Sequence, residues 1–142
     1  MTIRRNAGTS SAARRKRSRT PSVSELKLQD DIRLAYERSQ SVRLFRNNVG
    51  VLQDRNGSYV TYGLCPGSSD LIGFRSEILH CAVCGADYDN RRPVARFAAL
   101  EIKRPGELPT DTQEAFLRMV RAAGGIAGYA DSLELALAII KP

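Results

Sequence analysis

The sequence predicts an α/β fold in which helices flank a mixed β-sheet, and three observations support this prediction. Segments with helical periodicity alternate with short apolar runs in the order α-β-β-β-β-α-β-α. The 142 residues suit one domain of ordinary size, and no internal repeat divides them. The hydrophobic share of 42% allows a packed core, yet no apolar run is long enough to cross a bilayer. We therefore expect a soluble domain over residues 22–142 with no membrane partner.

The first half of this domain should contain one helix and three strands. A helix is expected from Ser22 to about Gln40, because apolar residues recur there at helical spacing. Residues 42–47 and 59–64 are strand-like, and the Asn56-Gly57 turn signal between them predicts that they pair. After Pro66-Gly67, residues 70–74 form the third predicted strand.

The second half is predicted to contain the central strand of the sheet. Residues 75–92 mix polar and apolar types without a period, so we expect a long hairpin connection there. Residues 94–103 are the most apolar strand candidate and should lie centrally. A helix over 110–123, a strand over 126–130 and a helix over 132–140 complete the order.

Positive charge is concentrated at the N-terminus. Seven of the 22 cations lie in residues 1–20 without a single acid, so the 15 cations that remain are balanced by 15 acids. The composition of residues 1–21 therefore predicts a disordered basic arm that binds phosphate backbones, and the alternative is a solvated tail. The segment also lacks the apolar stretch of a secretory signal, which predicts a cytoplasmic protein. The cations are Arg4, Arg5, Arg14, Arg15, Lys16, Arg17 and Arg19.

The cysteines suggest a weaker hypothesis. Cys65, Cys81 and Cys84 are odd in number, so we expect reduced thiols and not a disulfide framework. His80, Cys81 and Cys84 have zinc-like spacing, but a structural zinc site needs four ligands. Cys65 would complete the set only if the fold brought it close. A zinc-stabilised interaction module is accordingly one alternative function.

Two strand ends carry acids that suit a metal site. Asp70 begins one predicted strand, and Glu101 and Lys103 project from one face at the end of another, because side chains alternate along a strand. If these strands are neighbours, the two carboxylates can share Mg²⁺ or Mn²⁺, with Lys103 beside them. The alternative is a plain ion pair between Glu101 and Lys103.

The motifs around these residues resemble the VRR-NUC family of the PD-(D/E)xK nuclease superfamily, of the standalone type found in phages and prophages. The resemblance extends from about Ser22 to Ile140 and rests on four matches: Glu25 with Gln29, Phe45-Arg46-Asn47-Asn48-Val49-Gly50, Pro66-Gly67-Ser68-Ser69-Asp70-Leu71-Ile72-Gly73, and Glu101-Ile102-Lys103-Arg104-Pro105-Gly106 leading to Gln113.

This resemblance implies a restriction-endonuclease-like sandwich and a role for each matched residue. Asp70, Glu101 and the backbone carbonyl of Ile102 would bind metal, and Lys103 would be the catalytic lysine. Glu25 and Gln113 would support the site. Arg46 would face the site and suit a phosphate, unless it is only a surface arginine on an edge strand.

Two of these residues also fit a structural explanation. Ser22-x-x-Glu25 and Thr110-x-x-Gln113 both match the capping box, in which the third helical residue bonds back to the amide of the cap. Their side chains could therefore serve the helix, the site, or both.

The expected function is that of a metal-dependent DNA endonuclease, a hydrolase of phosphodiester bonds, with branched or junction DNA as a candidate substrate. A homodimer is expected because processing of a duplex or junction needs two cuts. If the chain is phage-encoded, the bacterial host cytoplasm is its location. The first alternative, ahead of the zinc module, is a non-catalytic nucleic-acid-binding protein whose affinity comes from the basic arm.

Overall fold

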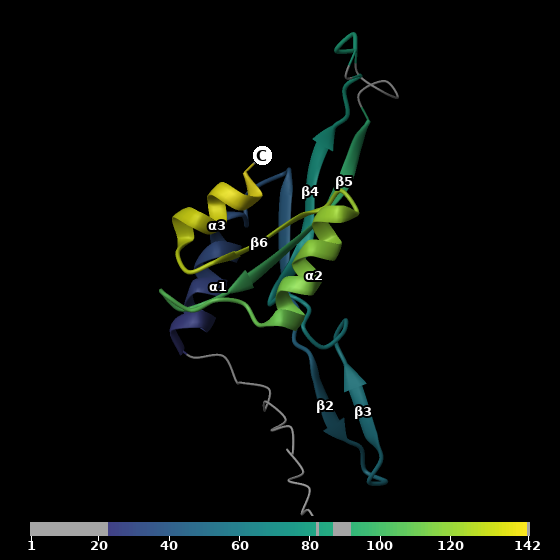
Figure 1. The fold of residues 1–142 in the computed structure, drawn as a ribbon, viewed down its shortest axis with the longest axis vertical. Coiled ribbons are helices and arrows are strands. Elements are labelled where there is room, and N and C mark those ends of the chain that lie inside the picture. Colours follow the sequence, from purple (N-terminus) through teal and green to yellow (C-terminus); the bar gives the residue numbers. More distant parts are fainter. Residues whose placement is uncertain (1–22, 82, 87–91, 142) are drawn as a thin grey trace, which may run out of the picture.

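The computed structural model describes residues 23–81, 83–86 and 92–141. In this part of the chain three helices flank a four-stranded mixed sheet, and a separate two-stranded ribbon projects from one end of it (Figure 1). The elements are α1 (Val23–Ala35), β1 (Val42–Arg46), β2 (Gly50–Gln53), β3 (Tyr59–Tyr62), β4 (Leu71–Ile78), β5 (Pro93–Ile102), α2 (Asp111–Ala122), β6 (Ile126–Ala130) and α3 (Leu133–Ile140).

The sheet has the order β1-β4-β5-β6, and β5 is one of its two central strands, as predicted. β4 runs antiparallel to both β1 and β5, whereas β6 runs parallel to β5. A parallel neighbour requires a crossover connection, and α2 supplies it. This arrangement confirms the predicted mixed sheet flanked by helices.

The predicted pairing of residues 42–47 with 59–64 is wrong. β1 pairs with β4, and an additional strand, β2, pairs with β3. The turn at Asn56-Gly57 closes a local hairpin, while Val42 and Leu44 of β1 are buried in the main core. The structure thus contains one strand more than the predicted order, because a turn signal fixes only its immediate flanks.

Two predicted boundaries also shift. α1 ends at Ala35 and not near Gln40, since the chain tightens into turns in which the amides of Tyr36 and Glu37 bond to carbonyls three residues earlier. The predicted connection over 75–92 is shorter, because β4 continues to Ile78. The bounds of β6 and the starts of α2 and α3 agree with the prediction, with Thr110 and Ser132 as N-caps.

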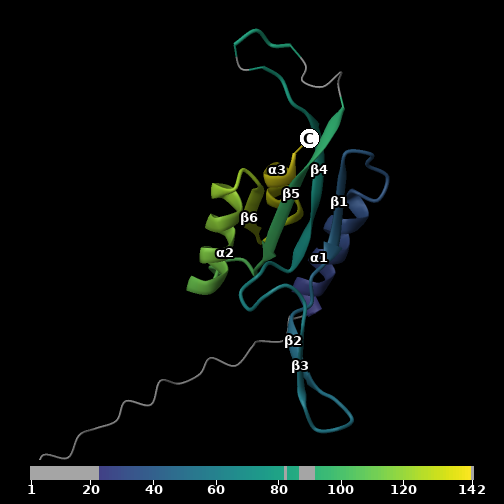
Figure 2. The ribbon, with the colours of Figure 1, turned by 90° about the vertical axis from the view of Figure 1, so that its right-hand side faces the viewer.

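The main core lies between the sheet and the α1–α3 layer. Its buried side chains include Ile32 of α1, Leu71 and Leu100 of the central strands, and Ile140 of α3. α2 lies against the opposite face of the sheet (Figure 2) and buries Leu117 and Val120 there. No helix of the described residues has the length and apolarity needed to cross a membrane.

β1 and β4 approach each other closely at Gly73. A Cβ atom at this position would collide with the carbonyl group of Arg43 in β1. This close approach fixes the position of β1 beside β4. The chain continues directly from β1 to the residues around Asp70.

Candidate metal and phosphate site

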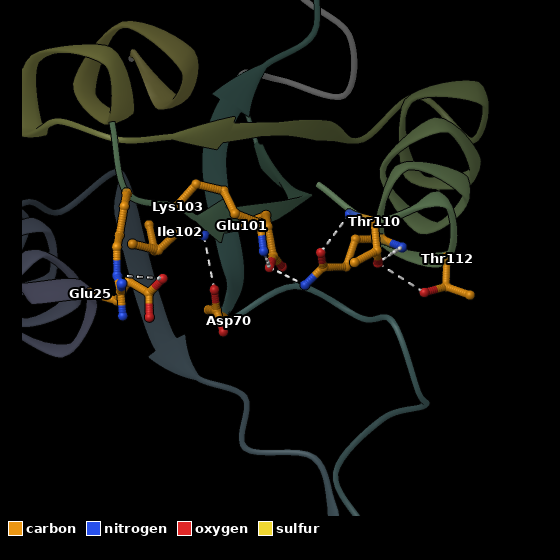
Figure 3. Close-up of polar contacts among 9 residues, drawn as sticks. Glu25, Asp70, Glu101, Ile102, Lys103, Thr110 and Thr112 are labelled. Carbon is orange, nitrogen blue, oxygen red and sulfur yellow. Dashed lines mark hydrogen bonds and ion pairs between the residues drawn. The ribbon is translucent and has the colours of Figure 1, made fainter. Parts of the chain in front are cut away.

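Asp70 and Glu101 meet at one end of the central sheet. β4 and β5 are neighbours, and their register pairs Leu71 with Leu100. One step further along each strand, Asp70 falls opposite Glu101, and Figure 3 shows the two side chains close to Ile102 and Lys103. The condition under which these two acids could share a cation is therefore met.

Glu101 is the most deeply buried charged residue of this group, with 1% of its surface exposed. Its Oε1 accepts hydrogen bonds from Lys103 Nζ, at 2.8 Å, and from Gln113 Nε2. Its Oε2 is buried and has no hydrogen-bond partner among the described residues. A buried carboxylate oxygen without a donor is unfavourable, so this atom is ready to accept a cation or a proton.

The surroundings of Glu101 favour its protonated form. Burial, followed by the nearby negative charge of Asp70, raises the pKa of the Glu101 carboxyl to about 7, although Lys103 acts in the opposite direction. In the absence of a bound cation, this carboxyl therefore exchanges a proton near neutral pH.

Asp70 is held by backbone groups on both sides. Its Oδ2 accepts a hydrogen bond from the Ile102 amide at 2.9 Å, and its own carbonyl accepts one from the Asn47 amide at 2.8 Å. Burial raises the pKa of the Asp70 carboxyl, the Ile102 amide and Lys103 lower it, and the negative charge of Glu25 raises it. The influence of Glu25 shows that a third acid lies within electrostatic range.

Lys103 projects from the same face of β5 as Glu101, as the strand alternation predicted. Its side chain is 14% exposed, and Glu101 is its ion-pair partner. The plain ion pair considered in the sequence analysis is thus present, and it places the ammonium group beside Glu101 and within electrostatic range of Asp70.

Glu25 lies in the first turn of α1, buried beside the loop that follows β5. Its Oε1 lies 3.8 Å from Nε of Arg104, the residue after Lys103 (Figure 3). A cleft of about 200 Å³ opens here, lined by Glu25, Lys103, Arg104 and Asp131 among others. Asp70 and Glu101 do not line this cleft, so it flanks the paired carboxylates. The proposed cap at Ser22 lies outside the described residues.

Gln113 completes the predicted capping box and also contacts Glu101. Its amide and its Oε1 complete the capping box with Thr110, where the Thr110 amide donates to Gln113 Oε1 at 2.8 Å. Its Nε2 donates to Glu101 Oε1. One side chain therefore links the N-terminus of α2 to the buried carboxylate.

Arg46 is directed toward α1. It shares a face of β1 with the buried residues Val42 and Leu44, and its guanidinium lies 2.8 Å from Asp30 and 3.4 Å from the Leu26 carbonyl oxygen. β1 is an edge strand, as the structural alternative assumed. The role of Arg46 toward a phosphate stays a prediction.

The structure separates the residues of the zinc hypothesis. Cys65 precedes β4 and Cys81 follows it, so the two lie beyond opposite ends of a strand that extends about 26 Å at roughly 3.3 Å per residue. Cys65 therefore does not complete a site with His80, Cys81 and Cys84. Within the described ranges, no three His, Cys, Asp or Glu side chains are grouped closely enough to hold a metal ion.

Asn47 belongs to the matched motif Phe45–Gly50, but no role was predicted for it. Its Nδ2 donates to Ser68 Oγ at 2.8 Å and to the Ser69 carbonyl at 2.9 Å, so it braces the segment that leads into Asp70. Asparagine as a residue type favours turns and carries no signal for such a role. The cations of residues 4–19 lie outside the described residues.

Comparison with known proteins adds no relative. No protein-family model, curated protein or solved structure matches this chain.

Proposed function

We propose that this chain is a divalent-metal-dependent DNA endonuclease with a restriction-endonuclease-like core of the VRR-NUC type. The observation that carries the proposal is the pairing of Asp70 with Glu101 on neighbouring strands, where one Glu101 oxygen is buried without a hydrogen-bond donor among the described residues. Lys103 and Gln113 both contact the other Glu101 oxygen, so the carboxylate is held in one orientation.

The residues present fit Mg²⁺ or Mn²⁺. Both cations favour oxygen ligands, and Asp70, Glu101 and the Ile102 carbonyl would provide them. Because the amide and carbonyl of one residue point to the same side of an extended strand, the Ile102 amide that bonds Asp70 supports this assignment. Burial is the main cause of the raised pKa of both carboxyls, and neighbouring negative charge adds to it, so a bound cation would stabilise their charged forms. When bound, such a cation lowers the pKa of a coordinated water and polarises a phosphoryl oxygen.

The chain's own groups would orient the reactants around this position. Lys103 can donate hydrogen bonds to a water or to a phosphate oxygen, and its positive charge stabilises negative charge that develops during phosphodiester hydrolysis. Gln113 keeps Glu101 from rotating, and Asn47 fixes the backbone that leads into Asp70. Glu25 adds negative charge near Asp70, with Arg104 as its ion-pair partner.

DNA is the proposed substrate, with branched or junction DNA as the form to examine first. The basic arm of residues 1–21 would supply phosphate contacts that carry no base information. A homodimer would provide two active sites for paired cuts, and a phage-type protein would act in the cytoplasm of a bacterial host.

A cleavage panel tests this function. Linear duplex, single-stranded, nicked, flap and four-way-junction DNA would each be incubated with Mg²⁺, Mn²⁺ or a chelator. We expect cleavage that requires metal and falls at least ~100-fold in Asp70→Asn and Glu101→Gln. Glu77→Gln is the matched control, because Glu77 lies at the other end of β4.

Three outcomes would contradict the proposal. DNA binding without cleavage in either metal would favour a non-catalytic nucleic-acid-binding protein. Stoichiometric zinc in the purified protein, with no cleavage, would favour the interaction module. Full cleavage by a folded Asp70→Asn variant would show that the assigned residues are not the site.

A further inference from the structure

The β2–β3 ribbon extends from the end of the sheet that carries Asp70 and Glu101. Figures 1 and 2 show it pointing away from the sheet and the three helices in both views. All residues from Val51 to Pro66 are exposed, including Tyr59 at 77%. An isolated two-stranded ribbon is only marginally stable in water. Packing of the core therefore does not account for this exposed ribbon, and another role must be sought.

The base of the ribbon is firmly attached beside the carboxylates. Asn47, which precedes β2, bonds to Ser68, Ser69 and Asp70. At the other strand, Gly63 has a φ of +86° and is packed against the backbone of residues 48 and 49, where a side chain would not fit. The direction of the ribbon is thus fixed relative to Asp70.

The tip of the ribbon is formally neutral, with Asp54 and Arg55 as its charged residues. The Asp54 carboxylate accepts hydrogen bonds from the amides of Asn56 and Ser58, both at 2.8 Å, so it is tied to its own turn. The Gln53 side-chain amide likewise donates to the Gly57 carbonyl. The neighbouring Arg55 is exposed, so its guanidinium can contact a nucleic acid.

We infer that the β2–β3 ribbon is a DNA-positioning arm whose tip enters the major groove of the substrate duplex. This inference rests on the proposed function. The major groove is about 12 Å wide and admits a two-stranded ribbon. The six residues from Gly50 to Arg55 are joined by five steps and extend at most about 17 Å at roughly 3.3 Å per residue, which corresponds to at most about five base pairs. The tip would therefore contact DNA within about half a helical turn of the phosphate at Asp70 and Glu101.

The side chains at the tip match this use. Arginine pairs with the edge of guanine in the major groove, and asparagine or glutamine pairs with adenine. Closer to the base, the exposed Leu52, Val60 and Tyr62 share one face of the ribbon, as their register shows. A second copy of the chain is the competing occupant of that face. DNA is favoured because Arg55 is exposed at the tip and the base of the ribbon is fixed beside the residues proposed to act on DNA.

The experiment combines two ribbon variants with two controls. Arg55→Ser and Tyr59→Ser alter the ribbon, whereas Arg92→Ser and Val83→Ser remove exposed side chains at the far hairpin, where Val83 is 95% exposed. Each would be assayed with Mn²⁺ on duplexes that carry 3, 6 or 12 base pairs beside the cut, and on bis(4-nitrophenyl) phosphate, a substrate too small to reach the ribbon.

We expect the ribbon variants to raise KM about 10-fold on the longer duplexes while kcat changes less than twofold. On the 3-base-pair duplex and on the small diester they should match the controls. Equal KM values for ribbon and control variants on every duplex would overturn the inference. A loss of dimers in a Val60→Ser variant, measured by sedimentation velocity with KM unchanged, would assign the ribbon to a second copy and also overturn the inference.

Failure of the proposed function would look different. In that case the unmodified protein would hydrolyse neither the duplexes nor the small diester. Duplex binding measured by fluorescence anisotropy would still test the ribbon, since Arg55→Ser should weaken it about 10-fold and an unchanged affinity would overturn the inference.

Discussion

β4 and β5 carry a charged cluster at each end, and the two clusters differ in sign balance. At one end, Asp70 and Glu101 share a single lysine, Lys103, and the pKa of each carboxyl is raised. At the other end, the single carboxylate of Glu77 lies 2.5 Å from Arg75 and 3.3 Å from Arg96. The hydrogen bond from Arg75 is the main reason that the pKa of Glu77 is lowered.

This difference separates a structural ion cluster from a candidate site. Around Glu77 the cations outnumber the acid, so the folded chain already stabilises the charged form. Around Glu101 the acids outnumber the cation, so the folded chain disfavours charge unless another cation arrives. Residue types and strand positions are similar at the two ends, and the balance of charge with burial distinguishes them.

The largest expected effect is that of removing Lys103, the cation of the Asp70–Glu101 cluster. Lys103→Met is expected to lower kcat by about 10²- to 10³-fold, because a positive charge beside the reacting phosphate is lost. Mn²⁺ affinity should be retained or increased, since the ammonium group no longer competes for Glu101. Arg96→Met, at the opposite end, should leave kcat unchanged. Calorimetric loss of Mn²⁺ binding in Lys103→Met would make the lysine a structural counter-charge.

The pH dependence of stability should reveal the raised pKa of Glu101. Between its ordinary value of 4.5 and the folded value of about 7, the folded chain keeps a proton that the unfolded chain has released. Metal-free stability should therefore fall as pH rises through this window, by up to about 3 kcal/mol. Glu101→Gln should remove this part of the slope in urea denaturation at several pH values. An unchanged slope would show that Glu101 titrates normally.

The Glu77 cluster should behave in the opposite way. Because the folded pKa of Glu77 is lowered, its stabilising contribution is present above its ordinary pKa of 4.5 and is lost as pH falls through the folded value. Glu77→Gln should accordingly flatten the acid side of the stability profile and leave the range from pH 5 to 7 unchanged. The same denaturation series measures both variants.

The smallest effects should separate the two functions of Gln113. Thr110→Ala removes the N-cap and should cost about 1 kcal/mol of stability with little change in cleavage. Gln113→Glu keeps a side chain that suits the capping box but replaces the donor to Glu101 with another acid. It should lower activity about 10-fold while the thermal midpoint changes little. Equal losses of activity in both variants would mean that the contact with Glu101 acts only through the helix.

The sequence predicted most of the second half of the fold. The apolar run of β5 and the capping pattern of α2 are local signals, and both elements lie where these signals indicated. The meeting of Asp70 with Glu101 also followed from their strand positions once β4 and β5 paired. Local sequence signals therefore predicted the elements that local interactions stabilise.

The first half could not be predicted to the same extent. The partner of β1 depends on which distant strand buries Val42 and Leu44, and the sequence between them offers a stronger local hairpin. The bracing of Asp70 by Asn47 has no sequence signal beyond a turn-forming residue type. The direction of Arg46 depends on Asp30, which lies on another element. These features come from tertiary contacts, which neither periodicity nor motif spacing records.

The close approach at Gly73 has a consequence for the tolerance of this chain to sequence change. Even the side chain of alanine would press on the carbonyl of Arg43 and move β1. The chain continues from β1 to Asn47, which bonds to the backbone of Asp70, and then to the β2–β3 ribbon. The neighbouring Phe74 is partly exposed and should accept many replacements. In a saturation-mutagenesis screen for cleavage, we expect position 73 to retain glycine alone, so that a residue with no side chain is among the least replaceable in the molecule.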